Sequence, residues 1–325
     1  MNLLKTLAAA AALAFATAAC GATPEAGIEA HGPSGILKGT FAAPDSVTAT
    51  TPVVLILPGS GPTDRDGNSP LGIRAAPYRM LAEGLAAQGV ASARIDKRGL
   101  FASAGAAADA DHLVMADYAA DAHAWIAALK QRTGASCVWL LGHSEGGLIA
   151  LVAAKDPHDI CGLILVSTPG RPAGDILREQ LKANPANAPI LDEALRAVDA
   201  LAAGHRYNTT GMTPALLPLF RDSIQDFLID EMSYDPAHLV ATYAGPVLVL
   251  QGTTDLQVSV ADAERLAAAR PGVRLVKLDG VNHVLKVAPA ERSANAALYA
   301  DPFAPLAPGI VDAIAAFVKA PPRAN

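Results

Sequence analysis

A serine stands where a predicted strand turns into a predicted helix. The segment from Gly142 to Gly146 reads Gly-His-Ser-Glu-Gly, and it lies between the apolar runs 138–141 and 148–152. In this context the two glycines permit a tight turn that exposes the serine hydroxyl at the edge of a sheet. The pattern predicts that Ser144 is a nucleophile.

A nucleophilic serine needs a base to take its proton and a carboxylate to orient that base. His283 follows the predicted strand 273–278, and Asp255 follows the predicted strand 247–250. We therefore expect both at the sheet edge where Ser144 emerges, in the chain order Ser, Asp, His. Asp279 is the alternative acid, although its closeness to His283 in the sequence favours a role in a turn. Surface or packing roles explain the other histidines, which are His31, His112, His123, His143, His158, His205 and His238.

A carbonyl attacked by serine becomes tetrahedral and negatively charged, so N–H donors must meet its oxygen. The backbone N–H of Glu145, directly after the nucleophile, supplies one donor. The loop 58–62 reads Pro-Gly-Ser-Gly-Pro, and its glycines let the backbone approach a substrate. We expect the second donor of this oxyanion hole to be the N–H of Ser60, with that of Gly61 as the alternative.

Apolar runs of strand length alternate with helical patterns along most of the chain. The predicted strands are 53–57, 90–95, 138–141, 163–166, 247–250 and 273–278. Apolar residues recur with the 3.6-residue period over 118–129 and 310–318, which indicates helices. This alternation predicts an α/β protein with a mostly parallel central sheet and helices on both faces. Such sheets bind ligands at the carboxyl ends of their strands.

About seventy residues interrupt this alternation without a convincing strand. Because a structureless loop of that length is rare, we interpret 170–244 as a helical cap inserted after the sixth strand. The segments 35–169 and 245–320 then form the core, and 21–34 is a linker. The cap either selects the acyl chain of a substrate or only packs its own core through apolar residues at Leu216, Leu217, Leu219, Phe220, Phe227, Leu228 and Met232.

The first twenty residues have the features of a secretory signal peptide. Lys5 is the only charge before Glu25, and small apolar residues lead up to Cys20. Residues 17–20 favour a lipobox, in which Cys20 is lipidated and attaches the protein to a membrane. The alternatives are ordinary cleavage after residues 16–18 and an uncleaved membrane helix, for which the alanine-rich run is poorly suited. Signal-peptide processing by either route predicts an exported protein that is periplasmic, anchored to the cell envelope or secreted.

Together these motifs resemble the α/β-hydrolase fold. The chain is similar to bacterial secreted carboxylesterases near the serine-aminopeptidase branch of that superfamily. The resemblance covers about residues 35–319 and rests on the segments 58–68, 96–99, 142–146, 255–258 and 282–286. It implies the triad Ser144, Asp255 and His283 and the hydrolysis of small carboxylic esters through an acyl-enzyme intermediate. Pro58 and Glu145 depart from the wider superfamily pattern.

Composition excludes several other functions. The net charge is −6, and no run of Lys or Arg offers the basic surface that nucleic acids require. No metal-binding spacing and no dinucleotide-binding glycine motif is present, so we expect neither a metal nor a cofactor. The sequence leaves the oligomeric state open.

Cys137 and Cys161 each lie near the start of a predicted core strand. Neighbouring strands are close enough for a disulfide, and export would permit oxidation. We nevertheless favour two buried thiols, because cysteines in core strands are commonly inert.

Two other functions are consistent with the same motifs. An aminopeptidase-like amide hydrolase would use the same machinery with a different leaving group, and a lipoprotein could keep the fold only for binding. The charged residues near the loop 58–62 are expected to hold it in an ion-pair network rather than to bind substrate, and they are Asp64, Arg65, Asp66, Asp96 and Arg98.

Overall fold

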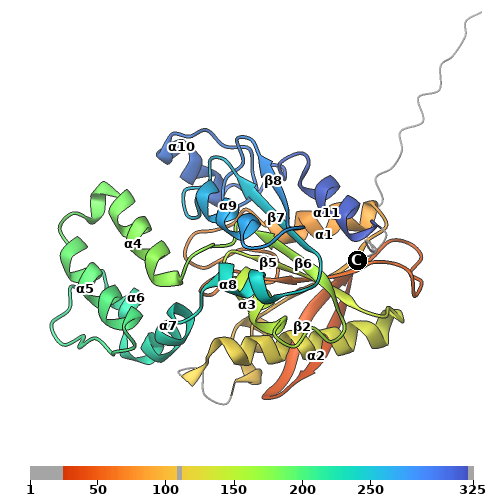
Figure 1. Cartoon of the computed structure of the whole chain (residues 1–325), viewed down its shortest axis with the longest axis horizontal. Coiled ribbons are helices and arrows are strands. Elements are labelled where there is room, and N and C mark those ends of the chain that lie inside the picture. Colours follow the sequence, from red (N-terminus) through yellow and green to blue (C-terminus); the bar gives the residue numbers. More distant parts are fainter. Residues whose placement is uncertain (1–24, 108–111, 321–325) are drawn as a thin grey trace, which may run out of the picture.

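The computed structural model describes residues 25–107 and 112–320, and an eight-stranded sheet runs through this part of the chain (Figure 1). The strands follow the order β1-β2-β4-β3-β5-β6-β7-β8 across the sheet. The pairs β1–β2 and β2–β4 are antiparallel and all others are parallel. The bounds are β1 (Glu25–Gly32), β2 (Gly35–Ala42), β3 (Val53–Leu57), β4 (Ala91–Ile95), β5 (Val138–His143), β6 (Ile160–Val166), β7 (Val247–Gly252) and β8 (Arg274–Leu278).

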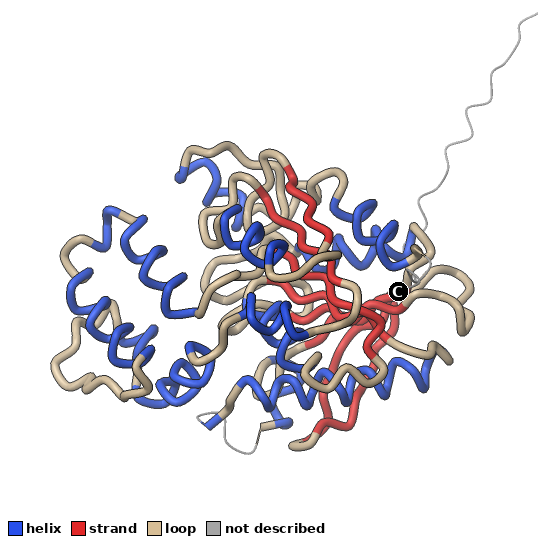
Figure 2. The backbone as a smooth tube through the Cα atoms, in the orientation of Figure 1, coloured by secondary structure: helices blue, strands red, loops and turns tan. Residues whose placement is uncertain are grey.

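Helices cover both faces of the sheet (Figure 2). Their bounds are α1 (Pro77–Ala87), α2 (Met115–Thr133), α3 (Glu145–Ala153), α4 (Ala173–Ala183), α5 (Leu191–Ala202), α6 (Leu217–Phe220), α7 (Gln225–Met232), α8 (Pro236–Thr242), α9 (Val260–Ala268), α10 (Arg292–Ala297) and α11 (Ile310–Val318). Short 3-10 turns span η1 (Phe101–Ala106), η3 (Pro185–Asn187), η4 (Asp222–Ile224) and η5 (Leu298–Ala300).

Strand β3 is apolar and buried at every position. Leu55 contributes to the core that contains Trp125 of α2, whereas Ile56 contributes to the core that contains Leu81 of α1. The first core also receives residues of α3, α8 and α9, and the second receives residues of α11. A strand covered on both faces has no polar side, so its sequence shows no alternation.

The prediction that residues 21–34 form a linker is wrong for most of that segment. Residues 25–32 form β1, which pairs with β2 along its whole length, from Glu25 opposite Ala42 to Gly32 opposite Gly35. Only Ile28 and Ala30 of this strand are buried. Such an edge strand with one buried face and interspersed glycines has a weak sequence signal, because most of its residues meet solvent.

Helices α4 to α7 lie to one side of the sheet (Figure 1). They surround a separate apolar core that includes Leu201, Leu216, Phe220 and Met232. Helix α8 also falls within the predicted cap 170–244, but its Val240 belongs to the core of the sheet. The region is thus helical as expected, whereas its last helix packs with the main core.

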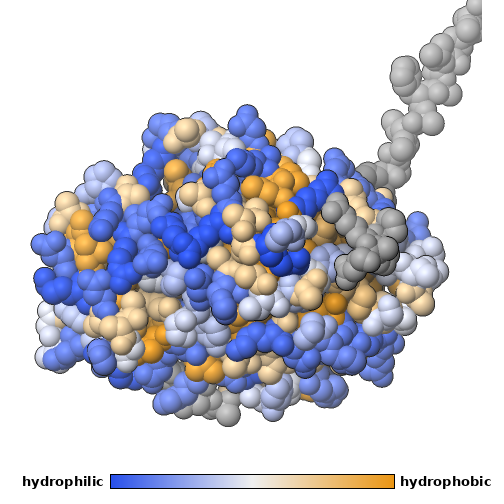
Figure 3. All heavy atoms as spheres, viewed as in Figure 1, coloured by the Kyte–Doolittle hydropathy of each residue, from blue (hydrophilic) through white to orange (hydrophobic). Residues whose placement is uncertain are grey.

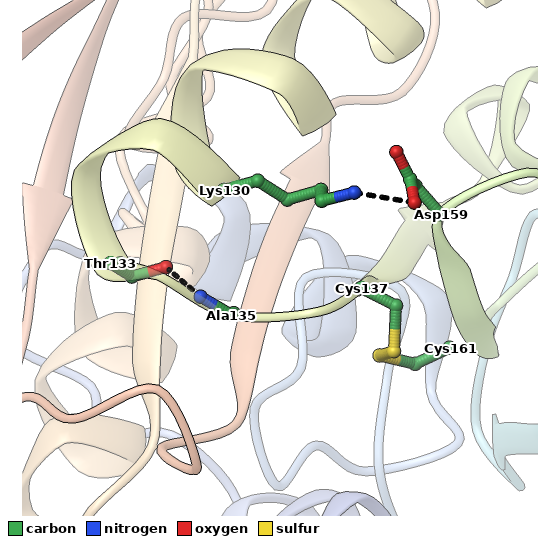
Figure 4. Close-up of a disulfide and its surroundings, with 6 residues drawn as sticks. All are labelled: Lys130, Thr133, Ala135, Cys137, Asp159 and Cys161. Atoms are coloured by element: carbon green, nitrogen blue, oxygen red, sulfur yellow. Dashed lines mark hydrogen bonds and ion pairs between the residues drawn. A yellow bond between two sulfur atoms is a disulfide. The ribbon is translucent and has the colours of Figure 1, made fainter.

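Our preference for two buried thiols is wrong. Cys137 and Cys161 form a disulfide, with their Cα atoms 5.2 Å apart (Figure 4). Cys137 directly precedes β5 and Cys161 lies in β6, and these two strands are parallel neighbours. Both residues are only half-buried at the end of the sheet where the strands begin. The bond therefore lies opposite the strand ends that carry Ser144.

The surface in Figure 3 mixes hydrophilic areas with smaller apolar ones. Within the described residues, no helix is long and apolar enough to cross a membrane. The predicted signal peptide and Cys20 lie outside the described residues.

Candidate active site

Ser144 lies in the turn between β5 and α3, with a φ of 55° and a ψ of −124°. This backbone conformation is unusual for a residue with a side chain, and it is held by the Ser144 N–H, which donates to Val166 O at 2.9 Å. A Cβ on Gly142 would lie 2.1 Å from Gly146 O, so the turn has no space for a larger residue there. The side chain of Ser144 remains partly exposed. The strand-to-helix turn inferred from the sequence is thus present.

Asp255 and His283 meet at the same end of the sheet. The loops after β7 and β8 carry them, and Nδ1 of His283 lies 2.9 Å from Oδ2 of Asp255 and 3.1 Å from Oδ1. Backbone N–H groups of Gln257 and Val258 donate to Oδ1 of the aspartate at 2.8 Å and 3.0 Å. Burial alone would raise the pKa of Asp255, but His283 and these two donors lower it below its ordinary value. The carboxylate is therefore ionised and points at the imidazole.

His143 connects the turn at Ser144 to the histidine loop. Its Nε2 lies 2.8 Å from the carbonyl oxygen of His283, and the centres of the two imidazole rings are 4.7 Å apart. Because His143 directly precedes Ser144, this contact brings the candidate nucleophile and the candidate base to the same site. Nδ1 of His283 faces Asp255, which leaves its Nε2 as the nitrogen available to a serine proton.

Tyr78 completes this hydrogen-bond network, and the donor and acceptor of each bond in the network can be deduced. Burial, together with the charge of a protonated His283, lowers the pKa of His143 to about 3, so its ring is neutral. The His283 carbonyl can only accept, and hence Nε2 of His143 carries the proton. Nδ1 must then accept from the Tyr78 hydroxyl at 2.8 Å, while that hydroxyl accepts from the Gly59 N–H at 3.2 Å. The sequence predicted a surface or packing role for His143 and has no signal for Tyr78, because the contact between them depends on the tertiary structure.

The loop after β3 lies directly beside the turn at Ser144. A Cβ on Gly59 would lie 3.2 Å from Cβ of Ser144, so glycine permits this close approach. The carbonyl of Ser60 accepts from Thr63 Oγ1 at 2.9 Å, and the carbonyl of Gly61 accepts from Thr63 N at 2.9 Å. Among the described residues, none accepts a hydrogen bond from the Ser60 N–H.

Glu145 begins α3, where backbone N–H groups have no partner within the helix and the helix dipole favours negative charge. Its N–H and that of Ser60 thus come from the two segments that border Ser144. The oxyanion hole at these two N–H groups stays a prediction.

The side chain of Glu145 forms a buried ion pair for which the sequence has no signal. Nζ of Lys97 lies 3.0 Å from Oε1 of Glu145 and donates to Gly59 O at 2.8 Å. The side chains of Lys97 and Glu145 are only 5% and 4% exposed. Lys97 belongs to the segment 96–99, which contributes to the family resemblance, but no sequence signal assigns the lysine a function.

The expected ion-pair network exists only in part. Arg65 donates to Asp96 through its N–H at 2.9 Å and through its guanidinium, which ties the loop after β3 to the end of β4. Asp64 instead accepts backbone N–H groups of its own loop. The two remaining residues of the predicted network form ion pairs with residues outside it. Asp66 pairs with Arg94 at 3.1 Å, and Arg98 pairs with Asp121 of α2 at 2.6 Å.

The sheet order, the strained serine and the buried acid–histidine pair define the class of this protein, which has the α/β-hydrolase fold. A family model described as serine aminopeptidase, S33, matches residues 72–212. A curated relative, Esterase EstD of Thermotoga maritima, is 26% identical over 240 residues. That match spans 72% of this chain and 54% of the relative, so the chain corresponds to about half of that protein.

Two solved structures share the fold. An esterase of Pyrococcus furiosus has a TM-score of 0.54 and 17% identity, with 84% of this chain and 87% of that chain covered. Est1E of Butyrivibrio proteoclasticus, solved with ferulic acid bound, has a TM-score of 0.53 and 16% identity, with 87% and 93% covered.

Proposed function

We propose that the protein is a serine hydrolase that cleaves carboxylic esters through an acyl-enzyme intermediate on Ser144. The observation that carries this proposal is the strained, partly exposed serine at the sheet edge where a buried aspartate orients a histidine. The esterase names of the relative and of both structural neighbours support the choice of ester as substrate.

In this mechanism Nε2 of His283 takes the proton of the Ser144 hydroxyl as the oxygen attacks the ester carbonyl. The N–H groups of Ser60 and Glu145 stabilise the oxyanion, and His283 returns the proton to the departing alcohol. Water that is deprotonated by His283 then attacks the acyl-enzyme and releases the acid. Asp255 stabilises the imidazolium that forms in each half of the reaction.

The experiment is a labelling and turnover assay on the purified protein. We expect a fluorophosphonate to label the wild type and not Ser144→Ala, and short-chain p-nitrophenyl esters to be hydrolysed only by the wild type. Aminoacyl p-nitroanilides are the matched amide substrates. Faster release from the anilides would favour the amide hydrolase. A folded wild type that is neither labelled nor active would favour a binding protein.

The cap is proposed to border the acyl site. Helix α7 packs on α2 through Tyr118 and Phe227, whose rings are 6.0 Å apart in an edge-to-face contact, and Nζ of Lys97 lies 5.4 Å from the centre of the Tyr118 ring. Through these contacts, the cap residue Phe227 is connected by Tyr118 to the Lys97–Glu145 ion pair beside Ser144. We expect Phe227→Ala to shift the preferred ester chain length, whereas Leu217→Ala, at an exposed cap position, leaves it unchanged. Identical chain-length profiles would contradict this role.

Export is a further part of the proposal. The disulfide supports it, because such bonds persist in oxidising compartments. The predicted signal peptide would be removed, and lipidation of Cys20 would attach the mature protein to the cell envelope. Mass spectrometry of the mature N-terminus tests this directly: a diacylglyceryl cysteine at position 20 is expected, and it should be lost in Cys20→Ala. An intact N-terminus at Met1 would contradict export by this route.

A further inference from the structure

The ammonium group of Lys97 contacts two segments that border the candidate nucleophile. Its ammonium group donates to the carbonyl oxygen of Gly59 at 2.8 Å and to Oε1 of Glu145 at 3.0 Å. The third neighbour is the Tyr118 ring, whose centre lies 5.4 Å away. A lysine buried to this extent is rare without a specific partner, because its charge loses the hydration of bulk water.

The contact with Gly59 determines the direction of the next N–H group. The carbonyl of Gly59 and the N–H of Ser60 belong to one peptide unit, which is planar and trans. In a trans peptide these two bonds point in opposite directions, so an ammonium group that holds the oxygen also aims the N–H away from itself. The preceding N–H, that of Gly59, is held by the Tyr78 hydroxyl at 3.2 Å.

The contact of Lys97 with Glu145 changes the electrostatic environment of the oxyanion. A buried carboxylate directly after the nucleophile would repel an oxyanion formed nearby, and the ammonium group offsets that repulsion. Burial and the charge of Glu145 raise the pKa of Glu231 in α7 to about 8, while the charge of Lys97 lowers it.

We propose that Lys97 is the positioning residue of the oxyanion hole, because it holds the Gly59–Ser60 peptide so that the Ser60 N–H faces the reacting carbonyl oxygen. This inference rests on the proposed ester hydrolysis and deepens it. Lys97 does not touch the substrate. Its effect is on the transition state, because a misdirected donor no longer meets the charge that develops there.

The experiment compares Lys97→Met with the double variant in which Glu145→Gln is added. The double variant removes both buried charges together and so avoids leaving one of them uncompensated, which favours folding. Lys130→Met is the matched control, because Lys130 also pairs with a carboxylate, Asp159 at 2.5 Å, but near the disulfide at the opposite end of the sheet (Figure 4). Active sites are counted by fluorophosphonate titration, so that misfolded protein does not enter the rates.

Per active site, we expect kcat on a p-nitrophenyl ester to fall about 10²–10³-fold in both Lys97 variants, as when one oxyanion donor is lost. KM should change less than about threefold. The inhibition constant of a trifluoromethyl ketone, whose serine adduct carries an oxyanion, should rise by the same factor as kcat falls. A role in stability alone would lower the melting temperature and leave these per-site values unchanged.

The two proposals fail in different ways. A folded double variant with the kcat and the ketone affinity of the wild type would overturn the positioning role of Lys97 and leave the esterase proposal intact. A wild type that is inert towards esters and fluorophosphonate would overturn the esterase proposal itself. Loss of activity in Lys130→Met equal to that in Lys97→Met would also contradict the positioning role, because it would indicate a general effect of losing an ion pair.

Discussion

Replacing Tyr78 by phenylalanine removes one oxygen atom and tests the network that connects three loops of the site. The ring remains, so the substitution opens almost no cavity. Without the hydroxyl, the Gly59 N–H loses its acceptor and Nδ1 of His143 loses its donor. Tyr78 is only 3% exposed, and water cannot readily replace its hydroxyl at such a buried position.

Each buried polar group left without a partner costs about 1–3 kcal/mol. Two such groups give an expected loss of about 2–6 kcal/mol in the free energy of unfolding. A domain with ordinary stability remains folded at 25 °C after a loss in the lower half of this range. Activity should fall as well, because the loop with Gly59 and the carbonyl of His283 are held through this one hydroxyl and the His143 ring.

Urea denaturation measures the loss, with kcat determined on the same preparations. Tyr234→Phe is the matched control, since Tyr234 is half-buried and its hydroxyl makes no hydrogen bond within the described residues. The control should stay within about 0.5 kcal/mol of the wild type. If Tyr78→Phe is equally close to the wild type, the deduced hydrogen-bond network is wrong.

Three further predictions concern the acid, the buried histidine and the disulfide. Asp255→Asn should lower kcat about 10³–10⁴-fold, because the amide favours the wrong tautomer of His283; a loss below tenfold in steady-state assays would contradict the assigned acid. The depressed pKa of His143, about 3 against an ordinary 6.5, contributes stability that is complete above pH 6.5. This stability falls by about 1.4 kcal/mol per pH unit as the pH drops towards 3, because only the unfolded chain takes up the proton. Urea titrations at pH 7 and 5 should therefore differ by about 2 kcal/mol from this group, and His143→Gln should reduce the difference. Replacing both Cys137 and Cys161 by serine should cost about 3.5 kcal/mol, as expected for opening a loop with a sequence separation of 24 residues. The variant should keep the wild-type kcat, because the bond lies at the far end of the sheet, and an unchanged melting temperature would refute the estimate.

Local sequence signals were sufficient for the elements that depend on local physics. The apolar runs mark the core strands because both sheet faces are covered, and the glycines around Ser144 mark the turn because no larger residue fits there. The order Ser, Asp, His predicted a pair that the structure brings to 2.9 Å, since both residues follow parallel strands that end at one edge of the sheet.

Contacts between distant segments could be seen only in the tertiary structure. The sequence has no signal that Lys97 donates to the Gly59 carbonyl or that Tyr78 reaches His143. It placed Cys137 and Cys161 within reach of a disulfide but did not decide that the bond forms. The edge strand β1 and the place of α8 were missed for a related reason. Their residues acquire a role from the surfaces that they pack against, and chain folding determines which surfaces meet.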